Sequence, residues 1–247
     1  MTFHNKVAVI TGGSSGIGKA VAIELVKKGA KVVINGRREQ TLAEAAKEID
    51  PTGLNIAYVA GDISKPQVAE RLISEAIARF GRVDTLVNNA GIFLAKPFTE
   101  YTEEDFDAVL STNVAGFFHI TQRVLTEMLK AGSGHIVNIT ASGVSEQPIK
   151  DVPSALAALT KGGLTTVSKS LAIEYADKGI RVNAVAPGVI KTPMHAPETH
   201  DFLSKLHPMK RMGEVHEIVE AILYLEAAQF VTGEVLHVDG GQSAGKW

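Results

Sequence analysis

Short β-rich runs alternate with longer helical segments from the start of the chain almost to its end. The cores of the candidate strands, such as residues 7–10 and 86–87, are continuously apolar rather than alternating. Continuous apolar strands are typical of parallel sheets that helices cover on both faces. The sequence therefore predicts repeated βαβ units that form a doubly wound, parallel, seven-stranded α/β sheet.

The pattern also places the individual elements. The predicted strands cover residues 7–10, 31–35, 55–60, 85–88, 135–140, 181–186 and 234–238. The predicted helices cover residues 17–28, 39–49, 66–80, 103–130, 154–177 and 214–228. We expect Thr102 to cap the helix over 103–130, because Asp105 adds acidic character to its first turn. No linker, repeat or step in composition divides the chain, so residues 1–247 are predicted to form a single domain.

Composition excludes several classes of protein. The 25 basic and 27 acidic residues leave a net charge of -2, which does not favour nucleic acid as a partner. The absence of cysteine excludes disulfides and thiolate catalysis, and no histidine spacing indicates a metal site. The chain has no apolar stretch near the roughly 18 residues of a membrane span and no signal peptide. We therefore expect a soluble cytoplasmic protein without a metal or a membrane partner.

A glycine-rich turn, Thr-Gly-Gly-Ser-Ser-Gly-Ile-Gly at residues 11–18, follows the first predicted strand and opens the first helix. Glycine lets the backbone approach a pyrophosphate, and the free N–H groups at the helix start favour negative charge. The turn therefore predicts a dinucleotide site, and its candidate ligands are Gly12, Ser14, Ser15, Gly16, Ile17 and Gly18. A purely structural turn is the alternative.

Several motifs along the chain then occur in the order of one family. They are Thr11-Gly12-x-x-x-Gly16-Ile17-Gly18, Asn88-Asn89-Ala90-Gly91, Asn113, Lys161, Pro187-Gly188 and Val238-Asp239-Gly240-Gly241. Together they resemble the short-chain dehydrogenase/reductases, and the resemblance covers nearly the whole chain. It implies a Rossmann-like fold, a nicotinamide cofactor across the carboxyl ends of the strands, and pairing into a homotetramer or homodimer.

The resemblance also implies roles for single residues. Asp62, with Ile63 beside it, would hold the adenine amino group, although a turn aspartate that caps the helix after Ser64 is the alternative. The remaining residues expected near the cofactor are Asn89, Ala90, Gly91, Lys161, Pro187, Gly188, Ile190 and Thr192.

The end of the second predicted strand indicates which cofactor is used. An acid there would accept hydrogen bonds from the ribose hydroxyls and select NAD. The chain has Asn35-Gly36-Arg37-Arg38 instead, and a guanidinium suits a 2′-phosphate. We therefore expect NADP(H) to be preferred over NAD(H), with Arg37 and Arg38 as the contacts. Arginines at the surface start of a helix are the alternative explanation.

The chain departs from the family at its proton donor. In the family a tyrosine four residues before the lysine passes a proton to or from the substrate oxygen. Lys161 is present, but Ala157 stands in the tyrosine position, and the other tyrosines fall on different elements. The sequence predicts space beside Lys161 for a ligand or a water chain, and Asn113 is expected to hold a water near Lys161.

The family's serine position is also altered, because it falls on Ala141. The loop that follows is longer than is usual for the family, so Ser142 or Ser145 could enter the site, and Ser142 is the preferred candidate to contact the substrate oxygen. A loop role is the alternative for both serines.

The segment over residues 188–213 holds three prolines and cannot be one unbroken helix, so it is predicted to be a lid. Its histidines, His195, His200 and His207, are candidates to replace the missing acid. His119 is a fourth candidate, but the favoured interpretation is that its side chain is packed in the protein or at an interface.

These observations predict an atypical NADP(H)-dependent oxidoreductase that acts on a carbonyl or hydroxyl compound. The alternative is a nucleotide-binding protein without redox activity, such as a ligand sensor, a scaffold, a lyase or an isomerase.

Overall fold

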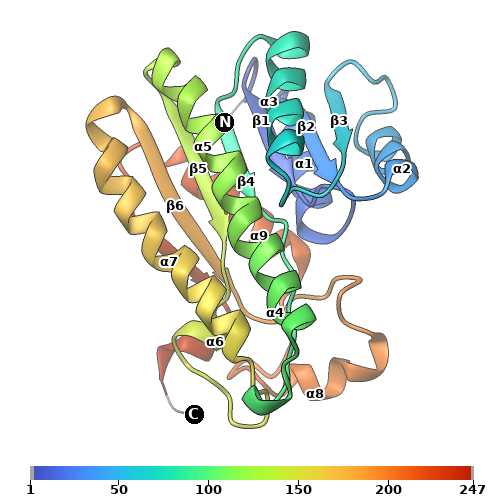
Figure 1. The fold of residues 1–247 in the computed structure, drawn as a ribbon, viewed down its shortest axis with the longest axis vertical. Helices are drawn as coiled ribbons and strands as arrows, with labels where there is room; N and C mark the ends of the chain where they lie inside the picture. The colour runs from blue at the N-terminus through green and yellow to red at the C-terminus, as the bar shows by residue number, and fades with distance from the viewer. Residues whose placement is uncertain (1–2, 246–247) are drawn as a thin grey trace.

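Seven parallel strands form one sheet in the order β3-β2-β1-β4-β5-β6-β7 in the computed structural model, which describes residues 3–245 (Figure 1). The strands are β1 Val7–Thr11, β2 Lys31–Gly36, β3 Ile56–Ala60, β4 Thr85–Asn88, β5 Gly134–Ile139, β6 Ile180–Pro187 and β7 Val235–Val238. All seven predicted strands and the predicted doubly wound parallel fold are confirmed.

Two layers of helices cover the sheet (Figure 1). The helices are α1 Gly16–Lys27, α2 Glu39–Ile49, α3 Pro66–Phe80, α4 Glu103–Leu110, α5 Gly116–Ala131, α6 Ser142–Ser145, α7 Ala155–Tyr175, α8 His200–Ser204 and α9 Val215–Ala227. Helices α1, α2 and α9 pack with one apolar core, and α3, α5 and α7 pack with a second core on the opposite face. Burial on both faces explains why the strand cores are continuously apolar.

The helix predicted over residues 103–130 begins as expected but is interrupted. The Thr102 hydroxyl accepts a hydrogen bond from the Asp105 backbone at 3.2 Å, and the Asp105 carboxylate accepts one from the Thr102 backbone at 3.1 Å. This capping box confirms the predicted start. Between α4 and α5, residues Ser111–Ala115 form a π-helical turn that contains Asn113. Such turns are frequent at functional sites.

The strand order reverses between β1 and β4, which lie side by side in the sheet. In open parallel sheets of this kind, ligands bind outside the carboxyl ends of the strands at the reversal. The glycine-rich turn follows β1 and the Asn89-Ala90-Gly91 segment follows β4, so both meet at this edge.

Residues 188–213 lie beyond the carboxyl ends of the strands (Figure 1). An isolated parallel bridge between Ile190 and Gly213 joins the two ends of the segment. Between them the chain forms a 3-10 helix at Pro197–Thr199 and the short helix α8. The segment is therefore a folded excursion from the sheet and, as its prolines indicated, not one unbroken helix. Within the described residues, no helix is both long and apolar enough to cross a membrane.

Candidate active site

A cavity of about 540 Å³ runs along the carboxyl edge of the sheet, within the range of small-molecule sites. Most of the residues predicted to bind a cofactor line it: Gly12, Ser14, Ser15, Gly16, Ile17, Arg37, Asp62, Ile63, Asn89, Ala90, Gly91, Lys161, Pro187, Gly188, Ile190 and Thr192. Of the other residues singled out from the sequence, Gly18, Arg38, Asn113, Ser142 and Ala157 are not among the lining residues.

Asn89, which follows β4, holds the glycine-rich turn by hydrogen bonds. The Asn89 Nδ2 donates to the carbonyl oxygens of Thr11 at 3.0 Å and Gly12 at 3.1 Å. A Cβ at Gly12, where φ is +66°, would lie 2.9 Å from that nitrogen, and a Cβ at Gly18 would collide with the Gly12 carbonyl. Gly18 therefore has a packing role behind the turn, whereas Gly12 leaves the backbone open to the cavity.

Asp62 and Arg37 border the end of the cavity near β2 and β3. One carboxylate oxygen of Asp62 accepts a hydrogen bond from the Ser64 backbone at 2.9 Å, which closes a local turn. The helix-capping role suggested as an alternative is not found, because the N-cap of α3 is Lys65 and no side chain caps that helix. Arg37 and Arg38 are both exposed, and neither guanidinium forms a hydrogen bond or ion pair within residues 3–245. Only Arg37 borders the cavity, because Arg38 occupies the position before α2.

Asn113 is buried, and both its amide oxygen and its amide nitrogen form hydrogen bonds within the protein. Its Oδ1 accepts a hydrogen bond from the Ile92 backbone at 2.9 Å, and its Nδ2 donates to the Ile92 carbonyl at 3.0 Å and to the Thr160 hydroxyl at 3.1 Å. This arrangement does not match the water-holding role expected from the sequence, since the amide already has its partners. Asn113 instead fixes the segment after β4 against α7.

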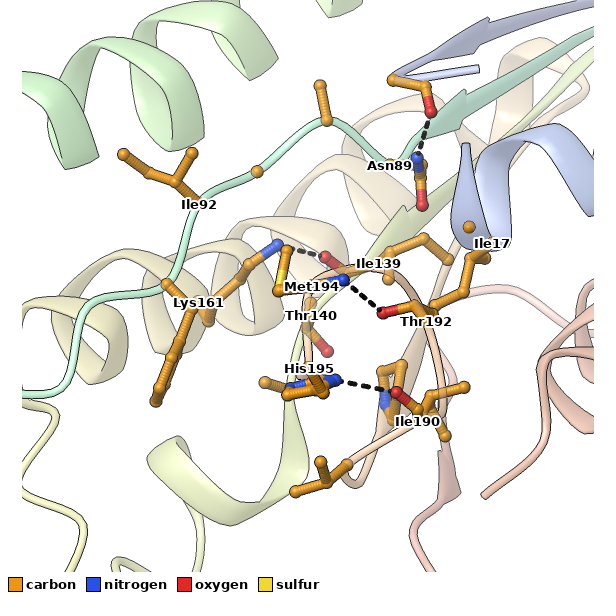
Figure 2. Close-up of a pocket in the computed structure, with 18 of the residues that line it drawn as sticks. Ile17, Asn89, Ile92, Ile139, Thr140, Lys161, Ile190, Thr192, Met194 and His195 are labelled. Atoms are coloured by element: carbon orange, nitrogen blue, oxygen red, sulfur yellow. Dashed lines mark hydrogen bonds between the residues drawn. The ribbon is translucent and has the colours of Figure 1, made fainter. Parts of the chain in front are cut away.

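Lys161 is half-buried on α7 and lines the cavity. Its Nζ donates a hydrogen bond of 2.7 Å to the carbonyl oxygen of Ile139 at the end of β5 (Figure 2). A Cβ at Gly91 would lie 3.0 Å from this Nζ and 3.3 Å from the Asn113 Oδ1, so the three residues meet beneath the cavity. Burial lowers the pKa of Lys161 to about 8.

Comparison with known proteins identifies the family. The family model described as short chain dehydrogenase matches residues 6–202. The chain belongs to the short-chain dehydrogenase/reductase family.

Individual relatives agree with this membership. The chain is 38% identical to an uncharacterized oxidoreductase of Thermotoga maritima, over 99% of this chain and 100% of the relative. It is also 38% identical to a glucose 1-dehydrogenase of Gluconobacter oxydans, over 97% of this chain and 92% of the relative.

Solved structures of relatives contain nicotinamide cofactors. ElxO with NADP bound is 35% identical and superposes with a TM-score of 0.89 over 97% of this chain and 99% of that one. The 3-ketoacyl-(acyl-carrier-protein) reductase from Brucella melitensis, complexed with NADH, is 34% identical with a TM-score of 0.89 over the same shares. This short-chain dehydrogenase/reductase is therefore similar, over nearly its whole length, to proteins whose structures hold NADP or NADH.

In this short-chain dehydrogenase/reductase the space beside Lys161 does not extend to Ala157. Ala157 is only 1% exposed and does not line the cavity, so the expectation of room for a ligand or water chain at this position is wrong for this structure. None of the chain's tyrosines, all within the described residues, lines the cavity either. Tyr101, for example, donates its hydroxyl to the Leu94 carbonyl at 2.9 Å.

Ser142 does not occupy the expected position at the substrate. Its side chain is fully buried, and its hydroxyl donates to the Pro187 carbonyl at 3.2 Å, with the Gln242 Oε1 at 3.3 Å. These partners hold the hydroxyl between β6 and the carboxyl-terminal segment, so the predicted contact with the substrate oxygen requires correction. The side chain of Ser145 lies outside the described part of the structure.

The four candidate histidines differ in whether they reach the cavity. His195 lines the cavity, whereas the other three do not. The Nε2 of His207 accepts a hydrogen bond from the Val189 backbone at 3.0 Å, and the Nε2 of His200 donates to the His195 carbonyl at 3.2 Å. His119 packs edge-to-face with Phe118, in keeping with the packed or interface position favoured from the sequence.

Sequence reasoning missed the side chains at the end of the cavity away from β2 and β3. They are mostly apolar and come from three separate segments: Phe93, Val144, Ile149, Val152, Leu203 and Leu206, with Ser154 among them. His195, which was a candidate from the sequence, lines the same cavity. These segments follow different strands, so no spacing along the chain links them. Within residues 3–245, no group of three or more histidine and acidic side chains is placed to hold a metal ion.

Proposed function

We propose that this chain is an atypical NADP(H)-dependent oxidoreductase that acts on an uncharged, largely apolar carbonyl or hydroxyl compound. The observation that carries the proposal is the single cavity that joins the glycine-rich turn, the Lys161 ammonium and an apolar end. The proposed molecule is one domain, with residues 188–213 as a lid over the cavity.

The described residues fit a nicotinamide dinucleotide. Gly12 and Gly16 expose backbone at the start of α1, where N–H groups and the helix dipole favour a pyrophosphate. Lys161 would donate to the ribose hydroxyls, Asp62 has a carboxylate oxygen left for the adenine amino group, and Thr192 would contact the carboxamide. Bound in this way, the cofactor supplies or accepts a hydride at the apolar end of the cavity.

NADP(H) is the proposed preference. The end of β2 has no acidic residue, because Asn35 and Gly36 occupy it. The exposed guanidinium of Arg37, which borders the cavity, has no competing partner within the described residues. A 2′-phosphate would gain a charge-assisted hydrogen bond there, whereas NAD(H) would not. Relatives hold NADP in one structure and NADH in another, so this preference rests on Arg37.

The atypical character rests on Ala157. A positioned general acid or base contributes roughly 10²- to 10⁴-fold to the rate, so a site without the tyrosine needs another group for the proton. Hydride transfer between oriented partners retains the contribution of proximity. We therefore propose a working oxidoreductase, with the non-redox nucleotide-binding protein as its rival.

The experiment combines binding with turnover. Calorimetric titration with NADPH and NADH is expected to show tighter binding of NADPH. A screen of NADPH consumption over neutral and carboxylate-bearing carbonyl compounds is expected to show turnover of neutral apolar ones. Cofactor binding without any turnover would favour the rival function, and tighter NADH binding would refute the cofactor preference.

A homotetramer or homodimer is the proposed assembly. Helices α4, α5 and α7 and the turn between α4 and α5 expose large apolar side chains, among them Phe106, Val114, Phe118, Leu159 and Ile173. Such a concentration of exposed apolar groups is typical of an interface. Light scattering at micromolar concentration is expected to give a multiple of the 26.2 kDa chain mass, and a monomer would refute the proposal.

A further inference from the structure

Four titratable side chains are among the described residues that line the cavity: Arg37, Asp62, Lys161 and His195. Arg37 and Asp62 follow β2 and β3, at the end proposed for the adenosine part of the cofactor. Lys161 and His195, both labelled in Figure 2, come from α7, which follows β5, and from the segment after β6. In the strand order β5 and β6 lie on the other side of β1 and β4 from β2 and β3, so these two residues belong to the opposite end. The proton of a substrate at that end therefore has two candidate partners.

The ring of His195 has a defined orientation. Its Nδ1 lies 2.9 Å from the carbonyl oxygen of Ile190. A carbonyl oxygen only accepts, so Nδ1 carries the hydrogen, and in the neutral ring Nε2 is then an unprotonated acceptor. Nε2 has no hydrogen-bond partner within residues 3–245, although the half-buried ring lines the cavity. The ring thus offers a free lone pair to whatever the cavity holds.

The backbone on both sides of the ring is also held. The His195 N–H donates to the Thr192 carbonyl at 3.0 Å, and the His195 carbonyl accepts from the Nε2 of His200 at 3.2 Å. Ile190, which holds the ring nitrogen, is itself buried and paired with Gly213. Since a general base must be held within hydrogen-bond reach of its proton, these bonds are what the role requires.

We propose that His195 is a catalytic residue that exchanges the reaction's proton with the substrate oxygen through Nε2. The inference rests on the proposed function. In alcohol oxidation the hydroxyl proton passes to Nε2, a hydride with its electron pair leaves the carbinol carbon for the nicotinamide, and the C–O bond becomes a carbonyl. In reduction the imidazolium returns the proton to the oxygen as the hydride enters the carbon.

The surroundings set the direction of the pH dependence. Burial lowers the pKa of His195, the Ile190 carbonyl opposes this, and a positive charge on His200 adds to the lowering. The Lys161 ammonium lines the same cavity and carries charge of the same sign. His195 is therefore neutral near pH 7, and alcohol oxidation should slow only as the pH falls through a value below the usual 6.5 of histidine.

The decisive variant is His195→Asn. An asparagine amide nitrogen can replace Nδ1 at the Ile190 carbonyl while the variant lacks Nε2. We expect kcat to fall roughly 10²- to 10⁴-fold, the acidic limb of the pH profile to disappear, and the NADPH dissociation constant from fluorescence to remain within about threefold. Added imidazole is expected to restore part of the activity of His195→Ala. His216→Asn, on the exposed face of α9, is the matched control and should behave as wild type.

A second measurement needs no turnover. Nitrogen-15 NMR of the histidine-labelled protein, with the His195 signals assigned by their loss in His195→Asn, should show the Nδ1–H tautomer. An Nε2–H tautomer would overturn the inference. So would a wild-type rate and pH profile in His195→Asn, with the proposed function left intact and Lys161 as the proton partner. Absence of turnover in the wild type would overturn both proposals.

Discussion

The side chain of Asn113 forms two hydrogen bonds with the backbone of Ile92, one to its N–H at 2.9 Å and one to its carbonyl at 3.0 Å. The π-helical turn between α4 and α5 carries Asn113, and Ile92 belongs to the segment that lines the cavity after β4. The pair therefore couples the break in the helix to the shape of the candidate active site.

Replacing Asn113 should damage both stability and binding. In Asn113→Ala the N–H and carbonyl of the half-buried Ile92 lose their partners, and leaving such groups unsatisfied costs up to about 1 to 3 kcal/mol each. We expect urea unfolding to show a loss of about 2 to 4 kcal/mol and NADPH to bind more weakly. Gln122→Ala, at an exposed position of α5, is the control and should change neither value. Unaltered stability would show that water replaces the amide.

The sequence predicted the sheet and most of the cavity wall, but not the role of Asn113. Apolar periodicity over residues 103–130 indicates a helix and is almost unchanged by one π turn, because such a turn shifts backbone hydrogen bonds and leaves the pattern of side chains largely intact. The glycine-rich turn, by contrast, was predictable because Gly12 and Gly18 are required by close backbone contacts that any side chain would block.

Arg37 and Arg38 should differ in their effect on cofactor choice. Loss of a charge-assisted hydrogen bond to a 2′-phosphate is worth about 1.5 to 3 kcal/mol, so Arg37→Ala should weaken NADPH binding roughly 10- to 100-fold and leave NADH binding unchanged. Arg38→Ala, whose side chain does not line the cavity, should change NADPH binding little. Calorimetry with both cofactors measures the effects. Equal effects of the two variants would contradict the assignment to Arg37.

Cofactor binding should weaken in alkaline solution because of Lys161. Its pKa is about 8, and only the ammonium donates three hydrogen bonds. NADPH affinity is therefore expected to fall as the pH rises through about 8. Lys161→Ala should bind roughly 10- to 100-fold more weakly below pH 7 and show no such decline. Lys169→Ala, exposed on the same helix, should keep the wild-type profile. An alkaline decline that persists in Lys161→Ala would assign it to another group.

The side chains at the substrate end of the cavity could not be predicted from the sequence. Ser142 follows a strand as a catalytic serine would, yet the structure turns its hydroxyl toward Pro187 and Gln242, which lie 45 and 100 residues away along the chain. Contacts of that range leave no local pattern. The same holds for Val144 and Leu203, which reach one cavity from two separate segments.

Ala157→Tyr tests the closed position beside Lys161. Because Ala157 is buried, a tyrosine there must displace its neighbours, and overpacking costs about 1 to 3 kcal/mol. We expect a loss of that size in urea unfolding and no gain in carbonyl reduction. Lys169→Tyr places the same side chain at an exposed position of α7 and should be neutral for stability. A large gain in reduction by Ala157→Tyr would mean that the site opens during the reaction and accepts a phenol as proton donor.

Glu226 on α9 is the centre of a buried polar network near the amino ends of the strands, away from the cavity. Its carboxylate accepts hydrogen bonds from Lys6 at 2.7 Å and from the Nδ1 of His135 at 2.5 Å. Asn183 uses its Oδ1 to accept from the Glu234 backbone, so its Nδ2 donates to the Nε2 of His135 at 3.0 Å. His135 is therefore neutral, and burial lowers its pKa accordingly.

The network should make stability depend on pH in acid. Burial by itself would raise the pKa of Glu226, but the hydrogen bond from His135 and the charge of Lys6 outweigh it and hold the pKa at about 2, against the usual 4.5. The unfolded chain thus binds the proton more readily than the folded one, and the stabilisation is complete above about pH 4.5 and is lost as the pH falls toward 2.

Glu226→Gln should therefore lower the free energy of unfolding by about 3 kcal/mol at pH 7, because one amide N–H₂ group then faces donors and Lys6 loses its counter-charge. The difference from wild type should shrink below pH 4.5, as measured by urea unfolding. Glu220→Gln, exposed on the same helix, is the control. A difference that stays constant down to pH 3 would indicate lost packing rather than lost charge. His135 lies at the start of β5 and the cavity lies beyond the end of that strand, so NADPH binding should be unchanged in Glu226→Gln at pH 7.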